Sequence, residues 1–399
     1  MAALLTLEEA QTQVLELARP LSAELVPVAE AGGRVTAEDV PARVDLPPFA
    51  SSAMDGFAAR AVDLPGTLGI AGESAAGRPF AGRLEAGAAV AISTGAVVPE
   101  GADVVVPVER VVKLENAVEI AFAAEAGAHV RPRGGDVAAG DAVAAAGQRL
   151  TPARLAAVAA SGVAALSCAR RPRVAVLATG TELVAPGEPL GAGQIYETNT
   201  LMLASAFAAT GAEVATEPPA ADDEAALRRA LGRGLAADVL VTSGGVSVGE
   251  HDLVRAVEHE LGVEEVFWRV SIKPGKPVSC GVRGKTLVFG LPGNPVSALV
   301  GCELFVKPAL RALQGLAQPL PQFEPGRLAA PLRRNEERDE FVRARSHVDG
   351  ETLVLEPILG QESHMIVRSG AADALVHIPR GNGEFAAGST VQWLRLDAA

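Results

Sequence analysis

Between residues 171 and 315 the hydrophobic pattern alternates between two periods. Short, continuous apolar runs are typical of buried strands, and the segments between them repeat apolar residues at helical spacing. This alternation predicts a doubly wound, parallel α/β sheet with ligand-binding loops at the carboxyl ends of its strands. The expected elements are, in order, the strand RVAVLAT, the helix NTLMLASAFAAT, the strand AEVATE, the helix DDEAALRRALGRGL, the strand ADVLVTSGG, the helix HDLVRAVEHEL, the strand and turn TLVFGLPGNP, and a long helix from Pro295.

The segments on either side follow other patterns. Thr6 can cap an amphipathic helix, with Glu9 three residues on, and Thr151-Pro152 starts a second helix. Between about 45 and 140, short β-like runs are broken by glycine and proline, which predicts a β-rich module. Beyond about 320 strands return, and EFVRARSHV and ETLVLEPI flank Asp349-Gly350, a strong hairpin signal. A chain of 399 residues with these patterns is expected to form several domains.

Composition narrows the classes of function. The net charge of −13 argues against non-specific nucleic-acid binding, so an anionic ligand would need a local cluster of donors. No membrane span is expected because no 18 consecutive residues are apolar, and acids near the start disfavour a secretory signal. The three cysteines lack zinc-site spacing and are expected to be reduced, buried thiols. These features predict a cytoplasmic globular protein.

Three loops of the α/β region are suited to anions. VTSGGVSVGEHD lies between a strand and a helix, so its glycines and amides can form an anion cradle, to which Ser243 and Ser247 add hydroxyls. Asp252 can cap the next helix or hold Mg²⁺ beside phosphates. IKPGKP places Lys273 and Lys276 around a Pro-Gly turn, and LPGNPVS offers free amides at a helix start. Each loop alone could be an ordinary turn, but together they predict a polyanionic ligand such as a nucleotide or pterin phosphate.

Other candidate residues are less specific. Glu182 in TGTEL follows a strand, at the end where ligands bind. Asp55 and Thr94 lie in loops of the β-rich module, where turn formation is the alternative role. GRGLAA fits a loose dinucleotide motif but follows a helix, which is the wrong context. The six histidines are scattered and GxSxG is absent, so a serine hydrolase is not expected.

Taken in order, the motifs resemble those of the molybdopterin molybdenumtransferase family, which includes MoeA and the gephyrin E domain. They run through nearly the whole chain in the family's order. The matching stretches are PPFASSAMDGFA, STGAVVPEGADVVVPVE, RPRGGDV, LATGTELVAPGEPLGAGQIYETN, VTSGGVSVGEHD, FWRVSIKPGKPVSCG, FGLPGNPVSAL and EFVRAR.

The resemblance implies a multidomain α/β fold with four parts. These are an elongated linker or dimerisation domain from residues 1–45 and 140–170, an inserted β-rich domain at 46–139, a MogA-like molybdopterin-binding α/β domain at 171–316, and a C-terminal β domain at 320–399. It also implies a homodimer whose active clefts are completed by both subunits, with a molybdopterin adenylyltransferase as substrate donor. The implied activity is insertion of molybdate into adenylylated molybdopterin with Mg²⁺-dependent release of AMP, the last step of molybdenum cofactor synthesis.

The family's functional positions carry over residue by residue. The residues at positions used for activity are Asp55, Thr94, Asp136, Glu182 and Asp252, and the metal positions are Asp222 and Asp252. The substrate-binding positions are Ser243, Gly244, Gly245, Ser247, Gly249, Lys273, Lys276, Pro292, Asn294, Pro295, Ser297, Arg343 and Ser363. Arg269 stands where lysine is frequent in relatives, which keeps the charge but changes the donor geometry.

The residue chemistry fits this assignment. Molybdate is a tetrahedral dianion, which lysine, arginine and hydroxyl donors suit, and a metal would polarise the pyrophosphate-type bond whose cleavage releases AMP. We hypothesise that a molybdate oxygen attacks the adenylyl phosphorus while Asp252, with Asp222, positions Mg²⁺. One alternative is a related adenylyltransferase or nucleotide pyrophosphatase, which lacks the SAMDGFA module and the PEGAD loop. Another is a protein-anchoring scaffold, which usually carries a fused domain and a long linker.

Overall fold

A computed structural model describes residues 4–220, 223–245 and 253–396. The chain divides into two compact units, which are described separately: Met1–Glu24 with Cys168–Ala399, and Leu25–Ser167. None of the helices in the described ranges has the length and apolarity needed to cross a membrane.

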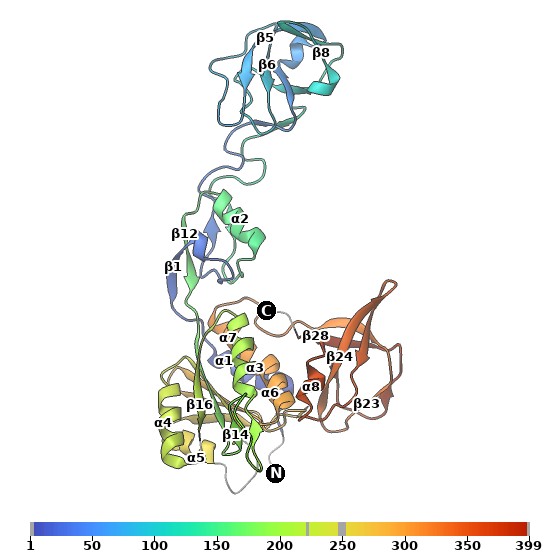
Figure 1. Cartoon of the computed structure of the whole chain (residues 1–399). Coiled ribbons are helices and arrows are strands. Elements are labelled where there is room, and N and C mark those ends of the chain that lie inside the picture. Colours follow the sequence, from blue (N-terminus) through green and yellow to red (C-terminus); the bar gives the residue numbers. More distant parts are fainter. Residues whose placement is uncertain (1–3, 221–222, 246–252, 397–399) are drawn as a thin grey trace. The chain divides into compact units, whose positions relative to one another are not determined.

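A six-stranded sheet forms the centre of the larger unit (Figure 1). Its strands are, in spatial order, β16 (Glu213–Ala220), β13 (Arg173–Thr179), β17 (Val239–Ser243), β21 (Thr286–Leu291), β20 (Ser279–Arg283) and β18 (Glu264–Trp268). The first four pair in parallel, β20 pairs antiparallel with β21, and β18 pairs antiparallel with β20 and so runs in the direction of the first four. The predicted parallel sheet is present and has an additional antiparallel strand, β20, because Gly284, with φ of 60°, and Lys285 form a two-residue turn that returns the chain from β20 into β21.

Alternate residues of the parallel strands enter two separate cores, which confirms the doubly wound arrangement. Val174 and Val176 of β13 lie in one core, and Ala175 and Leu177 lie in the other. In Figure 1, α4 and α5 cover one face of the sheet, and α1, α3, α6 and α7 cover the other. The helices are α1 (Leu7–Leu17), α3 (Asn199–Ala209), α4 (Glu224–Gly234), α5 (Leu253–Glu260), α6 (Pro295–Gly301) and α7 (Lys307–Leu313), with a π-helical turn (Cys302–Val306) joining the last two.

Helix α1 belongs to this α/β core. The predicted capping box is confirmed, since Thr6 accepts from the Glu9 N–H and Glu9 accepts from the Thr6 N–H. The apolar stripe of α1 packs into the same core as β13 and α7. Residues 1–24, which the sequence grouped with 25–45 and 140–170, fall in the larger unit here because this stripe is buried against the α/β domain.

At the amino edge of the parallel strands, one carboxylate binds two arginines. Asp238 directly precedes β17 and accepts two hydrogen bonds from the Arg170 guanidinium, at 2.7 and 2.6 Å. It also accepts from the Arg173 backbone N–H at 2.8 Å. Burial alone raises the pKa of Asp238, but the Arg170 and Arg173 hydrogen bonds outweigh it and hold that pKa below its usual range.

The C-terminal strands form a closed five-stranded barrel, in the order β24-β25-β22-β28-β26 with β26 pairing back to β24. These strands are β22 (Glu324–Leu328), β24 (Asp339–Asp349), β25 (Thr352–Pro357), β26 (Ala374–Ile378) and β28 (Thr390–Arg395); β23 (Leu332–Arg333), β27 (Glu384–Phe385) and α8 (Ile366–Ser369) lie outside it. The predicted hairpin is confirmed, with Gly350 and Glu351 as its turn. Strand β19 (Ile272–Lys273), from the α/β domain, pairs in parallel with the start of β24 and so joins the two domains.

The smaller unit is built on a second six-stranded sheet, β7-β4-β6-β5-β9-β8. Its strands are β4 (Gly56–Ala59), β5 (Gly66–Ser74), β6 (Ala88–Ile92), β7 (Val104–Pro107), β8 (Val112–Lys113) and β9 (Ala117–Ile120). A Cβ on Gly56 would lie 2.0 Å from the Val106 carbonyl oxygen, so only glycine fits where β4 meets β7. The β-rich module predicted between 45 and 140 is thus present.

Two antiparallel chain segments lead into and out of this sheet. They pair as β2 (Val40–Pro41) with β11 (Ala142–Ala144), and as β3 (Ser51–Ser52) with β10 (Val130–Arg131). Helix α2 (Pro152–Ala160) begins after the Thr151 cap, as predicted. The remaining elements of the chain are β1 (Ala23–Pro27), β12 (Ala165–Ala169), β14 (Leu183–Val184), β15 (Ile195–Tyr196) and the short 3₁₀ helices Val28–Glu30, Ala61–Asp63 and Val108–Arg110.

Candidate active site

Two glycine-containing loops meet at the carboxyl edge of the parallel sheet. After β17, Gly244 and Gly245 have φ of 98° and 64°, and a Cβ on Gly244 would lie 2.6 Å from the Thr179 carbonyl oxygen. After β21, Gly293 lies beside this loop, since a Cβ built on it would be in van der Waals contact with the Gly244 Cα, at 3.7 Å. A side chain at Gly244 would clash with the Thr179 backbone, so glycine is required where this loop leaves the carboxyl edge of the sheet, the edge where ligands bind in this fold.

Asn199, the first residue of α3, holds these two loops together. Its Nδ2 donates to the Ser243 hydroxyl and to the Gly293 carbonyl oxygen, both at 2.8 Å. Its Oδ1 is buried and has no hydrogen-bond partner among the described residues. The sequence assigned no role to Asn199, although it ends the quoted ETN stretch. The signal that could have identified Asn199 is its place at a predicted helix start, directly after a glycine-rich loop.

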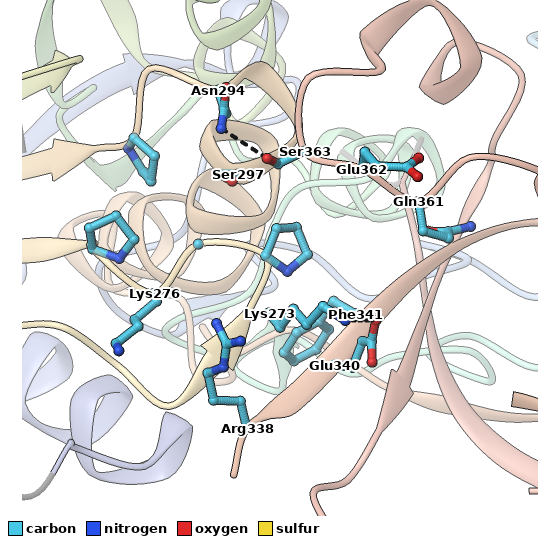
Figure 2. Close-up of a pocket in the computed structure, with 14 residues that line it drawn as sticks. Lys273, Lys276, Asn294, Ser297, Arg338, Glu340, Phe341, Gln361, Glu362 and Ser363 are labelled. Atoms are coloured by element: carbon cyan, nitrogen blue, oxygen red, sulfur yellow. Dashed lines mark hydrogen bonds and ion pairs between the residues drawn. The ribbon is translucent and has the colours of Figure 1, made fainter. Parts of the chain in front are cut away.

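A cavity of about 320 Å³ lies between the α/β domain and the barrel (Figure 2). Three cationic side chains, Lys273, Lys276 and Arg338, lie along one side of it, and Asn294, Ser297 and Ser363 lie across from them. The cavity also includes Pro292, Glu340, Gln361 and Glu362. Segments separated by up to 90 residues thus meet here because β19 pairs with β24. Sequence analysis predicted Lys273, Lys276, Pro292, Asn294, Ser297 and Ser363, and it missed Arg338.

The two lysines of the KPGKP turn differ in their partners. Lys273 Nζ lies 3.0 Å from Glu340 Oε1, its cross-strand neighbour in the β19–β24 pair. Lys276 is exposed and has no ion pair within the described part of the chain. Gly275 between them has φ of 107°, and a Cβ there would lie 3.2 Å from Ile272 Cδ1. The turn therefore presents one neutralised and one available ammonium group.

Ser363 is positioned by the start of α6. Its hydroxyl accepts from Asn294 Nδ2 at 2.9 Å (Figure 2), and its carbonyl accepts from the Val296 N–H at 3.1 Å. The expectation that LPGNPVS offers free amides is therefore wrong for Val296. Pro295 is the first residue of α6, and Ser297 is buried in the first turn of that helix.

Arg343 does not face the cavity. It is fully buried, and its guanidinium donates to the Gly360, Glu362 and Met365 carbonyl oxygens and to the Ser369 hydroxyl. Burial lowers the pKa of this guanidinium, against the raising effect of the Glu362 charge. The predicted direct contact of Arg343 with substrate does not fit this geometry, because its donors are already used to hold the loop that carries Ser363.

Arg269 stacks its guanidinium on the Trp268 ring, 3.7 Å from the ring centroid, and Arg255 lies 4.0 Å from the same centroid. The Arg269 backbone has φ of 77°, which is uncommon for a residue other than glycine. The Arg269 N–H donates to the Val278 carbonyl oxygen, and the Val270 N–H donates to the Lys276 carbonyl oxygen. The backbone at this position therefore supports the base of the KPGKP turn, while the positive side chain lies on the Trp268 ring.

In the smaller unit, the Asp55 carboxylate accepts a 2.7 Å hydrogen bond from the Thr94 N–H, so the structure brings these two predicted residues together. Both are exposed. Asp136 is exposed in the segment after β10, where its N–H donates to the Leu46 carbonyl oxygen. In the larger unit, Glu182 is exposed in the loop after β13.

Comparison with known proteins identifies the family. The MoeA N-terminal region (domain I and II) matches residues 5–162, the probable molybdopterin binding domain matches 175–312, and the MoeA C-terminal region (domain IV) matches 325–396. Molybdopterin molybdenumtransferase 2 of Mycobacterium tuberculosis H37Rv is 40% identical, over 97% of this chain and 98% of its own. This chain belongs to the molybdopterin molybdenumtransferase family. The Haemophilus influenzae molybdopterin molybdenumtransferase is 36% identical, over 97% and 98% of the two chains.

Solved structures of the family have the same fold. The molybdopterin biosynthesis MoeA protein of Pyrococcus horikoshii OT3 matches with a TM-score of 0.85 at 27% identity, covering 98% of this chain and 100% of that one. A MoeA protein from Pyrococcus horikosii matches with a TM-score of 0.82 at 32% identity, covering 99% of both chains. The predicted multidomain α/β fold class is confirmed, and this molybdopterin molybdenumtransferase homologue is an enzyme with a role in molybdenum cofactor biosynthesis.

Four of the predicted site residues of this family member, Asp222, Ser247, Gly249 and Asp252, lie outside the described residues. Their roles in metal and substrate binding remain predictions. Within the described residues, no three His, Cys, Asp or Glu side chains are grouped as a metal site.

Proposed function

We propose that this chain inserts molybdate into adenylylated molybdopterin and releases AMP, the last step of molybdenum cofactor synthesis. The observation that carries the proposal is the cavity between the α/β domain and the barrel. In a chain of net charge −13, three cationic side chains and two serines line this one cavity, together with two glutamates. Cations and hydroxyls are the donors that a tetrahedral dianion needs.

The carboxyl edge of the sheet supplies the second half of the proposed site. The Ser243–Gly245 loop presents backbone close to Gly293, and Asn199 fixes both loops. A phosphorylated pterin or nucleotide bound there would extend into the cavity past Pro292 and Asn294. These two residues follow β21 and line the wall of the cavity. We propose that the chain's role in the reaction is to hold molybdate and the pyrophosphate-type bond next to each other, because positioning removes most of the entropic barrier.

We propose Mg²⁺ as the cofactor, held by Asp252 and Asp222. Mg²⁺ usually takes one or two carboxylates and completes its shell with water and substrate phosphates, so a cluster of three acidic side chains is not required. Among the described residues, Glu182, exposed in the loop after β13 at the carboxyl edge, carries an oxygen donor of the right chemistry. A bound divalent cation would neutralise charge on the phosphate oxygens at this edge.

We further propose a cytoplasmic homodimer that receives its substrate from a molybdopterin adenylyltransferase. Cys168, Cys280 and Cys302 are buried and form no disulfide bonds, as expected for a protein of a reducing compartment. Asp55, Thr94, Asp136 and Glu182 are proposed to act in the reaction. Their exposure leaves them accessible to a substrate or to a second subunit.

The deciding experiment is AMP release by the purified chain from adenylylated molybdopterin, with and without molybdate and Mg²⁺. The proposal predicts release that requires both ions and yields active cofactor. Lys276→Ala should raise the KM for molybdate, whereas Lys285→Ala, an exposed lysine in the β20–β21 turn, should not. Tight binding of the pterin substrate without molybdate-dependent release would contradict the proposal and favour a scaffold.

A further inference from the structure

We propose that Asn199 is a positioning residue for the transfer reaction, because it sets the spacing between the two loops that carry the two substrates. This inference rests on the proposed function. The first loop, Ser243–Gly245, follows β17, and the second loop, Pro292–Asn294, follows β21, the neighbouring strand of the parallel sheet. In the proposed function, the first loop binds the phosphorylated pterin and the second forms a wall of the oxyanion cavity.

The Asn199 amide joins the two loops with both of its N–H groups. Nδ2 donates at 2.8 Å to the Ser243 hydroxyl in the first loop and at 2.8 Å to the Gly293 carbonyl oxygen in the second. The residue is only 7% exposed, and its Oδ1 has no partner among the described residues. The protein therefore uses this side chain for its two donors, and an aspartate or a serine would supply at most one.

The Ser243 hydroxyl has its own two partners within the protein. It accepts from Asn199 and donates to the Pro292 carbonyl oxygen at 3.4 Å, which is a second link from the first loop to the second. The residue is buried. A hydroxyl used in both directions has little left to offer a ligand, so we assign Ser243 to joining the loops and not to a direct substrate contact.

Asn199 is itself held in place by its neighbours. The Glu197 carboxylate accepts from the Thr200 N–H at 2.8 Å, and the Glu197 N–H donates to the Val184 carbonyl oxygen at 2.8 Å. Helix α3, which starts at Asn199, buries Leu203 in the core of the α/β domain. The amide is thus a fixed reference point, and the two loops are placed relative to it.

The second loop extends this arrangement to the cavity. Asn294 Nδ2 donates to the Ser363 hydroxyl at 2.9 Å, and both residues line the cavity (Figure 2). Loss of the Asn199 amide would let the two loops shift relative to each other, while each loop keeps its own contacts with its substrate. The loss should therefore fall on the step that needs both substrates together, which is measured by kcat.

The test compares Asn199→Ala and Asn199→Asp with the wild type in the AMP-release assay. Gln314→Ala and Gln314→Glu are the matched controls, because Gln314 is an equally buried amide whose Nε2 donates to the Thr210 and Leu310 carbonyl oxygens, at 3.1 and 3.0 Å. Thr210 directly follows α3, so Gln314 holds the other end of the helix that starts at Asn199. Thermal unfolding of all four variants is measured alongside.

The kcat of both Asn199 variants should fall about tenfold to a hundredfold, because a misplacement of about 1 Å between reacting groups costs this much. The KM values for molybdate and adenylylated molybdopterin should change less than about threefold, as should the calorimetric Kd for inorganic molybdate. The Gln314 variants should lose a similar amount of thermal stability and keep the wild-type kcat. Asn199→Ser, which retains one donor, should have an intermediate kcat and provides the comparison if Asn199→Ala does not fold.

Two results would overturn the inference. A kcat of folded Asn199→Asp within about twofold of wild type would leave Asn199 with a role in stability alone, and a raised pterin KM at unchanged kcat would make it a substrate contact. An equal fall of kcat in the Gln314 variants would assign the effect to α3 as a whole, which also contradicts a specific role for Asn199. A wild-type chain that releases no AMP would overturn the proposed function itself, and the inference with it.

Discussion

The two edges of the same parallel sheet use charged and polar groups in opposite ways. At the amino edge, Asp238 is fully engaged by Arg170 and the Arg173 N–H. At the carboxyl edge and in the adjoining cavity, Asn199 Oδ1, Lys276 and Arg338 have no partners among the described residues. Asp238 thus has its hydrogen-bonding capacity used at the amino edge, whereas the three groups at the carboxyl edge and cavity have capacity left for a ligand.

This difference separates stability from function. Polar groups that already have partners stabilise the fold and have little left to offer a ligand, whereas available donors beside a cavity add little to stability and can bind substrate. Changes at the amino edge should therefore lower the free energy of unfolding and leave KM unchanged. Changes at the cavity should raise KM and leave the free energy of unfolding unchanged.

The largest expected effect follows loss of the Asp238 carboxylate. Asp238→Ala leaves the partly buried Arg170 guanidinium without its acceptor, and we expect it to lower the free energy of unfolding by about 3 kcal/mol. Urea unfolding followed by circular dichroism measures this. The control Glu217→Ala breaks the more exposed pair with Arg233 and should cost less than about 1 kcal/mol. A raised molybdate KM in folded Asp238→Ala would contradict the view that the amino edge contributes to stability and not to substrate binding.

The contribution of Asp238 should also depend on pH, because its pKa is lowered in the folded state. A carboxylate with a lowered folded pKa stabilises the protein above its unfolded pKa, about 3.9, and this stabilisation is lost as pH falls towards the folded pKa. The difference in unfolding free energy between wild type and Asp238→Asn should therefore be constant above about pH 5 and shrink below about pH 4. A difference that grows in acid would contradict this assignment.

At the cavity, the two lysines of the KPGKP turn should differ. Lys276→Ala removes an available charge and should raise the molybdate KM about tenfold or more. Lys273→Ala removes a charge already paired with Glu340 and should raise it only about threefold. Unfolding midpoints of both variants should match wild type. Equal effects of the two substitutions would show that the Glu340 pair does not occupy Lys273 in solution.

The smallest expected effect is a gain. Glu340→Gln removes a carboxylate from the cavity wall and releases Lys273, so the molybdate KM should fall by about two- to threefold. The gain is small because Lys273 is 46% exposed and its ion pair is already screened by water. A higher KM in Glu340→Gln would mean that Glu340 positions Lys273 for the substrate.

The doubly wound domain, the β-rich module and the Gly350 hairpin could be predicted from sequence because each depends on local signals: apolar periodicity, capping residues and turn glycines. The placement of α1 in the α/β domain could not be predicted from sequence, because an apolar stripe of this kind could pack against the core of any domain. The antiparallel strands β18 and β20 were missed, since short runs beside a two-residue turn resemble a loop.

In the candidate site, too, some residues could be predicted from the sequence and others could not. Lys273, Lys276 and Ser297 lie in sequence motifs, and the structure places all three at one cavity. Arg343 was given a substrate contact because it matches a position of the family, but a matching position does not show that four protein oxygens already use its donors. Arg338 was missed because its importance depends on the β19–β24 pairing, a contact between segments about 65 residues apart.

The most direct test of the account is calorimetric titration of the double variant Lys276→Ala/Arg338→Ala with inorganic molybdate, beside wild type and Asp238→Asn. If the available cations of the cavity bind the oxyanion, the double variant will unfold at the wild-type urea concentration and show no measurable molybdate binding, while Asp238→Asn will be destabilised and bind normally. Wild-type affinity in the double variant would contradict the account and place the oxyanion site elsewhere in the chain.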